Sequence, residues 1–208
     1  RELAALNVAR LEAEIETLQA ALNMRRSRES AQAVAGLAQS TETGAADPGG
    51  LLAEAFATNQ KLSDYLLQST EYRNELTQRN LRARQQLDGI SQASAVLDQQ
   101  LQALQGSVLL AKILYEQKSA LPVLTLDASL ADRIADTRLY QFEINQLRDQ
   151  LGDPAARVQA QLDAHAGAVP QATREALQAL LETRAELLDR LNRELNALLG
   201  EAITLQLA

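Results

Sequence analysis

Between Leu62 and Val108 the chain carries a mostly apolar stripe whose positions are separated alternately by four and three residues. A repeat averaging about 3.5 residues keeps one face of a helix against a partner helix over many turns, which is typical of coiled-coil packing. The stripe comprises Leu62, Leu66, Ser69, Arg73, Leu76, Asn80, Ala83, Leu87, Ile90, Ser94, Leu97, Leu101, Leu104 and Val108. The pattern predicts an all-α fold, an elongated antiparallel helical bundle or coiled coil built on one very long helix, without a β-sheet.

Two further helices carry stripes with the same spacing. The last helix repeats it through Leu177, Leu181, Arg184, Leu188, Leu191, Leu195, Leu198, Ala202 and Leu205. The first helix, which we expect to fade near Ser40, carries it from Val8 onward. As the candidate packing or interface seam we single out Leu11, Ile15, Leu18 and Leu22 of the first helix and Leu62, Leu66, Leu76 and Asn80 of the second. An uncovered stripe on the first helix would be an apolar patch of the kind that marks an interface.

Polar residues interrupt the long stripe, and two interpretations of them stay open. Asn80 and Ser94 can set the register of packed helices, as single buried polar residues do in coiled coils. Alternatively the stripe rotates locally and these residues are exposed, because a straight helix drifts by about 20° per heptad from a strict repeat. Arg73 can pack its stem in the seam and extend its charged head to water.

Glycine and proline mark the expected ends of the helices. Asp47-Pro48 resembles an N-cap followed by proline at the first helical position, and Leu121-Pro122 ends the helix that starts there. Uninterrupted, this helix has about 70 residues and a length of about 100 Å, provided that packing offsets the cost of Gly89 and Gly106. Asp127 begins the next helix, Gly152-Asp153-Pro154 separates it from a short helix through about Ala166, and Gly167 and Pro170 precede the last one.

These helices predict two segments placed end to end. Residues 1–85 form the first, in which the opening helix folds back along the N-terminal half of the long helix. Residues 86–208 form a three-helix bundle from the C-terminal half of the long helix and the later helices, since short connections favour antiparallel neighbours. The first segment, with two helices only, should receive another helix from upstream of Arg1 or from another subunit. Arg1 lies inside a helical pattern without a signal peptide, so we expect a piece of a longer protein.

Composition and charge argue against several classes of function. The net charge of −7 argues against nucleic-acid binding, which needs a concentrated basic surface. No apolar run approaches the roughly 20 residues that span a bilayer. The chain has no cysteine and one histidine, His165, and it lacks the common phosphate-loop, zinc-protease and nucleophile-elbow motifs. We therefore predict a protein that is not an enzyme, with no catalytic residues, cofactor or metal site.

The stretch that follows Gly106 carries the more specific motifs. It reads VLLAKILYEQKSALPVLTLDASLADRIADTRLYQFEINQLRDQL and contains Leu-Pro at 121–122, Ile-Ala-Asp at 134–136, Arg-Leu at 138–139, Gln-Phe at 141–142 and Asn-Gln-x-Arg-Asp-x-Leu at 145–151. In these features it resembles the periplasmic N-terminal ("porin") domain of the large MscS-superfamily mechanosensitive channels of the KefA/MscK type. The resemblance extends over most of the chain, although generic coiled-coil character can produce it outside residues 108–151.

The resemblance implies a non-catalytic periplasmic domain of an inner-membrane channel that opens under tension during hypoosmotic shock. Such a domain would serve as a spacer, an aid to assembly or a contact to the envelope, with other channel subunits, envelope proteins or the cell wall as partners. The alternative is a stand-alone coiled-coil scaffold or adaptor, and self-association fits either interpretation. A helical carboxylate metal enzyme is a third hypothesis, but Leu162 stands where its Glu-x-x-His motif needs glutamate.

Overall fold

The computed structural model describes residues 2–39, 50–103, 108–123, 128–164 and 169–207. The helices in these ranges are α1 (Glu2–Gln39), α2 (Leu51–Ala103), α3 (Val108–Ser119), α4 (Leu130–Leu151), α5 (Pro154–Ala164) and α6 (Gln171–Gln206). No strand occurs among the residues described. The expected all-α fold built on a long helix is confirmed, and the 53 residues of α2 extend over about 80 Å.

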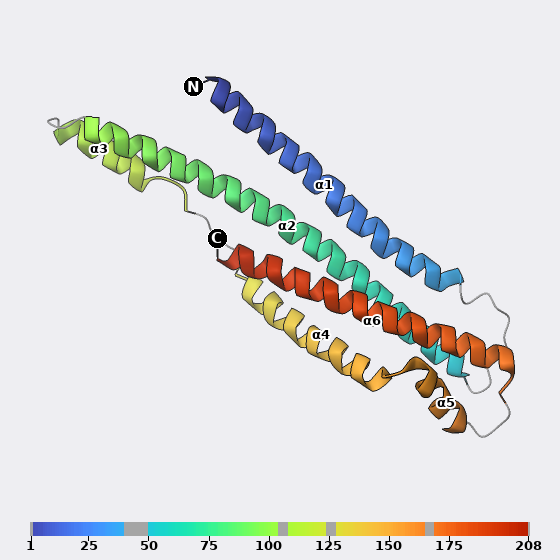
Figure 1. Ribbon diagram of the computed structural model, residues 1–208. Coiled ribbons are helices and arrows are strands. Elements are labelled where there is room, and N and C mark those ends of the chain that lie inside the picture. Colours follow the sequence, from blue (N-terminus) through green and yellow to red (C-terminus); the bar gives the residue numbers. More distant parts are fainter. Residues whose placement is uncertain (1, 40–49, 104–107, 124–127, 165–168, 208) are drawn as a thin grey trace.

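The centre of the molecule is a pair of parallel helices, α2 and α6 (Figure 1). Their relative direction follows from three hydrogen-bonded contacts that each join residues 121 positions apart, namely Asn59 with Leu180, Arg73 with Glu194 and Asn80 with Glu201. The four-three stripe of α6 faces this interface, and every leucine that belongs to that stripe, from Leu177 to Leu205, is at most 5% exposed. Each leucine buried in this way contributes roughly 1.5–3 kcal/mol.

Helices α4 and α5 run in the opposite direction and pack against α6 (Figure 1). Ile144 and Leu151 of α4, with Val158 and Leu162 of α5, join the main apolar cluster with Leu66 of α2. The expected break between the two helices is confirmed. Gly152 has a φ of 58° and donates its N–H to the Arg148 carbonyl oxygen, and the Asp153 carboxylate accepts the first free N–H groups of α5.

The course of α2 differs from the expected unbroken helix through Leu121. Helix α2 ends at Ala103, and α3 turns back along its C-terminal part (Figure 1), where Lys118 forms an ion pair of 2.6 Å with Asp98. Beyond Ala83 the stripe is only partly buried, because α6 ends near this level and α3 is short. A longer α2 would therefore gain little packing energy to offset the cost of about 1 kcal/mol that a glycine has inside a helix.

The placement of the later helices also differs from the expectation. They do not cover the C-terminal part of the long helix; α6 is hydrogen-bonded to α2 between Ala55 and Asn80, in its N-terminal and central parts. Helix α1 lies antiparallel along α2, as expected, and contacts it from Thr70 to Gln85. Three helices, α1, α4 and α6, thus surround one stretch of α2. The division of the chain at residues 85 and 86 stays a prediction.

Several expected boundaries lie outside the described residues: the fading of the first helix near Ser40, the Asp47-Pro48 start, Gly106, Asp127 and the end at Ala166 and Gly167. Among the described helices, none is long and apolar enough to cross a membrane.

Candidate interaction surface

The apolar stripe of α1 faces away from the rest of the molecule. Leu11, Ile15, Leu18 and Leu22 are 51%, 49%, 60% and 48% exposed. Neither of the two apolar core clusters of buried residues contains a residue of α1. We call these four residues the α1 stripe. In the part of the chain that the structure describes, nothing covers it, and a coiled-coil stripe on a helix surface suits a second helix.

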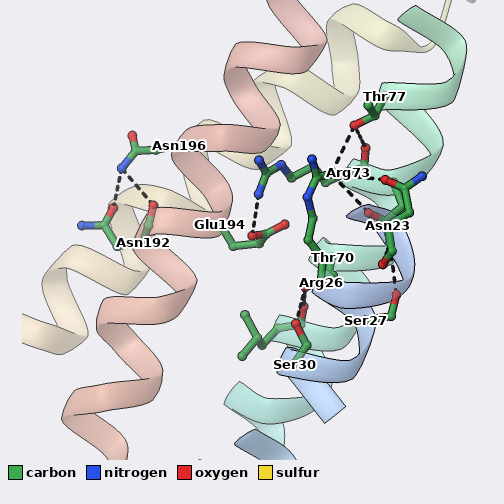
Figure 2. Close-up of polar contacts among 12 residues, drawn as sticks. Asn23, Arg26, Ser27, Ser30, Thr70, Arg73, Thr77, Asn192, Glu194 and Asn196 are labelled. Atoms are coloured by element: carbon green, nitrogen blue, oxygen red, sulfur yellow. Dashed lines mark hydrogen bonds and ion pairs between the residues drawn. The ribbon is translucent and has the colours of Figure 1, made fainter. Parts of the chain in front are cut away.

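The face of α1 that contacts α2 is polar instead. On this face of α1, Asn23 is buried. The side-chain amide of Asn74 in α2 donates to the Ser27 hydroxyl and, at 3.5 Å, to the backbone carbonyl oxygen of Asn23. The hydroxyls of Ser30 and Thr70 share a hydrogen bond of 2.9 Å; Figure 2 draws this contact between α1 and α2. Exchanging water for such neutral hydrogen bonds stabilises by only about 0.5–1.5 kcal/mol each. Helix α1 is therefore held by polar contacts while its apolar face remains open.

The second half of the predicted seam has the opposite environment. Leu62, Leu66, Leu76 and Asn80 of α2 are at most 7% exposed and lie against α6. The Asn80 amide donates to both the backbone and a carboxylate oxygen of Glu201, at 2.9 Å each. The structure thus places Asn80 inside the seam and leaves the α1 stripe as the exposed part of the candidate interface.

Three polar layers join α2 to α6 within their apolar interface. Arg184 donates to the Asn59 side chain at 3.0 Å and to the Ala55 carbonyl oxygen at 2.9 Å. Burial lowers the pKa of the Arg184 guanidinium from its ordinary value, although Glu54 raises it in part. Arg73 and Asn80 form the other layers with Glu194 and Glu201. A shift of one heptad would leave these buried groups unpaired, so the layers determine the register.

The Arg73 head does not extend into water, because it pairs with Glu194 at 2.9 Å and the side chain is 20% exposed. Sequence reasoning included Arg73 and Arg184 in the stripes but did not find their partners. Asn59 precedes Leu62 by three residues and Leu66 by seven, so it continues the four-three stripe of α2 toward the N-terminus. This spacing is the signal by which Asn59 could have been included in the stripe.

A second apolar surface lies on α4, where Leu139 and Phe142 are 57% and 66% exposed. The Tyr140 ring contacts Tyr65 of α2, with centroids 4.7 Å apart. A cavity of about 540 Å³ between α2 and Leu121–Val123 is lined by Gln86, Gly89, Ile90, Ala93, Leu121, Pro122 and Val123, none of which titrates. The described residues contain no cluster of three metal-ligating side chains, and His165 lies outside them.

Comparison with known proteins relates the chain to channel proteins. The mechanosensitive channel MscK of Escherichia coli (strain K12) is 34% identical over 207 residues, which cover 100% of this chain and 18% of that protein. An uncharacterized MscS family protein of Haemophilus influenzae is 36% identical over 149 residues, covering 72% of this chain and 13% of that protein. No family model matches. The chain therefore spans less than a fifth of the length of either relative.

Proposed function

The chain belongs to the MscS family, since it is 34% identical over its whole length to one mechanosensitive channel and 36% identical over 72% of its length to an MscS family protein, and we propose that it is a non-catalytic accessory domain of a mechanosensitive channel. The parent protein would reside in the inner membrane and protect the cell during hypoosmotic shock, with this domain in the periplasm. Within it, the domain serves as a spacer and assembly element. Helix α2 is about 80 Å long, and this length suits a spacer, since packed parallel helices resist bending.

The single observation that carries the assembly role is the α1 stripe. Its residues follow coiled-coil spacing, are about half exposed, and lie on a helix whose other face is occupied by α2. A helix of the parent channel, from another part of the same subunit or from a neighbouring subunit, would bury them. Such a docked helix would cover the apolar stripe of α1 in the way that α2 covers the apolar stripe of α6.

Cysteine crosslinking in the complete parent channel tests this role. The chain has no cysteine of its own, so Leu18→Cys introduces the one reactive thiol of this domain in an otherwise cysteine-free channel. Thr17→Cys is the matched control, because Thr17 is also exposed but points about 100° away around the helix. We expect Leu18→Cys to be protected from a water-soluble maleimide in the assembled channel, whereas Thr17→Cys reacts freely. Because the channel offers no other thiol, a disulfide crosslink forms only where the Leu18→Cys positions of two subunits meet.

Equal labelling of the two cysteines in the assembled channel would contradict the assembly role. Crosslinking of Leu18→Cys in the isolated domain, at the level found in the whole channel, would instead assign the stripe to self-association of this domain.

A further inference from the structure

A groove between α1, α2 and α6 gathers more positive charge than the adjacent carboxylates neutralise. It has a volume of about 310 Å³, and its charged lining consists of Arg26, Arg73, Arg190, Arg193, Glu29 and Glu194. Figure 2 shows Arg26 of α1 and Arg73 of α2 extending into the space that Glu194 of α6 approaches. In a protein with a net charge of −7, such an accumulation of arginines from three helices is unusual.

The ion pairs of the groove leave three arginines in surplus. Glu194 pairs with Arg73, and Glu29 pairs with Arg25, which is outside the groove lining. Among the described residues, Arg26, Arg190 and Arg193 form no ion pair. Arginine forks bind oxyanions through paired N–H donors, so the surplus suits an oxyanion.

Arg26 is the central member of this surplus. It contacts only neutral oxygens of Asn23, Asn74 and Thr77, at 3.3–3.4 Å, which are long hydrogen bonds. Burial lowers the pKa of the Arg26 guanidinium, and the charge of Arg73 lowers it further, although Glu194 and Glu201 raise it in part. A bound anion would remove this repulsion between cations.

Among the described residues, two buried atoms of the groove-lining side chains have no hydrogen-bond partner, and they are of opposite type. The Nε–H of Arg73 is a donor without an acceptor, and Oε1 of Glu194 is an acceptor without a donor. Both atoms are shielded from water in the unliganded chain, so a ligand that satisfies both reaches them through a shift of the Arg73 and Glu194 side chains. Hydrogen phosphate has acceptor oxygens and one P–OH donor, whereas sulfate at neutral pH has acceptors only.

We propose that this groove binds a phosphate group that retains a hydroxyl, with Arg26, Arg73 and Arg193 donating hydrogen bonds to its oxygens and the Glu194 carboxylate accepting a hydrogen bond from its P–OH group. The anion would link α1 to the α2–α6 pair. Apart from such an anion, α1 contacts α2 through polar groups that include the Arg26 guanidinium and the Glu16 carboxylate. This site is independent of the channel assignment, because it rests on the groove alone.

Titration calorimetry on the whole chain at pH 7 tests the proposal with inorganic phosphate, and with sulfate and chloride at equal ionic strength. We expect saturable binding of phosphate, and about tenfold weaker binding of sulfate, since one buried hydrogen bond is worth about 1.4 kcal/mol or a factor of ten. Arg193→Gln should weaken phosphate binding by about tenfold because it removes one charged donor. Arg193 is exposed, so this variant is expected to fold normally.

Two further variants make the test specific. Arg28→Gln is the matched control, because Arg28 is on the same helix two residues from Arg26 but is exposed and outside the groove lining, and the phosphate affinity of this variant should stay unchanged. Glu194→Gln replaces an acceptor oxygen by an amide donor, so it should reverse the preference toward sulfate. Absence of phosphate binding, equal binding of chloride, or equal losses in Arg28→Gln and Arg193→Gln would overturn the site.

A phosphate monoester on a lipid offers the same chemistry as the free ion. Vesicles containing phosphatidic acid, compared with phosphatidylcholine alone, distinguish the two sources. Vesicle binding that Arg193→Gln weakens assigns the groove to a lipid headgroup, and binding of inorganic phosphate alone assigns it to the free anion. If neither binds, the proposal fails.

Discussion

Leu76 and Leu22 occupy equivalent positions in four-three stripes, yet the structure places them in opposite environments. Leu76 of α2 is 0% exposed and packs in the cluster with Leu198 and Ala202 of α6. Leu22 of α1 is 48% exposed and belongs to neither core cluster. Truncating each residue to alanine therefore measures how much a stripe residue gains from its partner helix, with the chemical change held constant.

The expected costs follow from the carbon atoms that each substitution removes. Leucine to alanine deletes three carbons, worth about 0.8 kcal/mol each on full burial, and a cavity in a tightly packed seam adds to this. Leu76→Ala should therefore lower the free energy of unfolding by about 3–4 kcal/mol. For Leu22→Ala about half of the transfer term applies and no enclosed cavity forms, while alanine is the better helix former, so we expect less than about 1 kcal/mol.

Urea denaturation of the isolated chain, followed by circular dichroism at 222 nm, measures both values. The slope of the free energy with urea should match the wild type in both variants, so that the midpoints report stability alone. Equal losses in the two variants would refute the reasoning, since they would mean that the α1 stripe is buried in solution as deeply as the α2 seam.

Three further predictions concern local features of the bundle. Gly152→Ala should lower the free energy of unfolding by about 1–2 kcal/mol, because the φ of 58° at Gly152 is unfavourable for a residue with a side chain. Gly89→Ala should raise it by about 0.5–1 kcal/mol, because Gly89 lies inside α2 with open space around it. Thermal unfolding of the two variants should therefore show shifts of opposite sign. A double-mutant cycle on Arg73→Ala and Glu194→Ala should give a coupling above about 1 kcal/mol, more than exposed ion pairs give, because both side chains are at most 20% exposed; a coupling near zero would refute this. Burial, with Tyr140 adding to it, raises the pKa of Tyr65, so the unfolded chain loses this proton near pH 10 before the folded one does. The contribution of Tyr65 to the free energy of unfolding should thus be constant below about pH 9 and fall as the pH rises above about 10, and urea midpoints should show that Tyr65→Phe removes this part of the decrease.

The sequence predicts the helices well because their ends depend on local chemistry. Gly152 and Asp153 end one helix and cap the next through their own backbone and side-chain preferences, and the structure has both features there. The end of α2 at Ala103 was not predictable in this way. It lies well beyond the level at which α6 ends, in the part of α2 along which α3 turns back, and no proline marks it in the sequence.

The candidate interface was predictable as a pattern but not as a surface. The spacing of Leu11, Ile15, Leu18 and Leu22 identifies one face of α1, and the same spacing identifies the seam at Leu76. The charged groove was not found, because Arg26, Arg73 and Arg193 are far apart in sequence and each alone resembles an ordinary surface arginine.

The amino-acid sequence by itself determined which residues form helices and which face of each helix is apolar, since both depend on neighbours within a few turns. The tertiary structure alone decided that α2 pairs in parallel with α6, that α1 packs by its polar face, and that arginines from three helices meet. A heptad stripe indicates that a helix packs against a partner helix, but it does not identify that partner. The buried contacts of Asn59, Arg73 and Asn80 with α6 make that choice, because each would be left unpaired in another register.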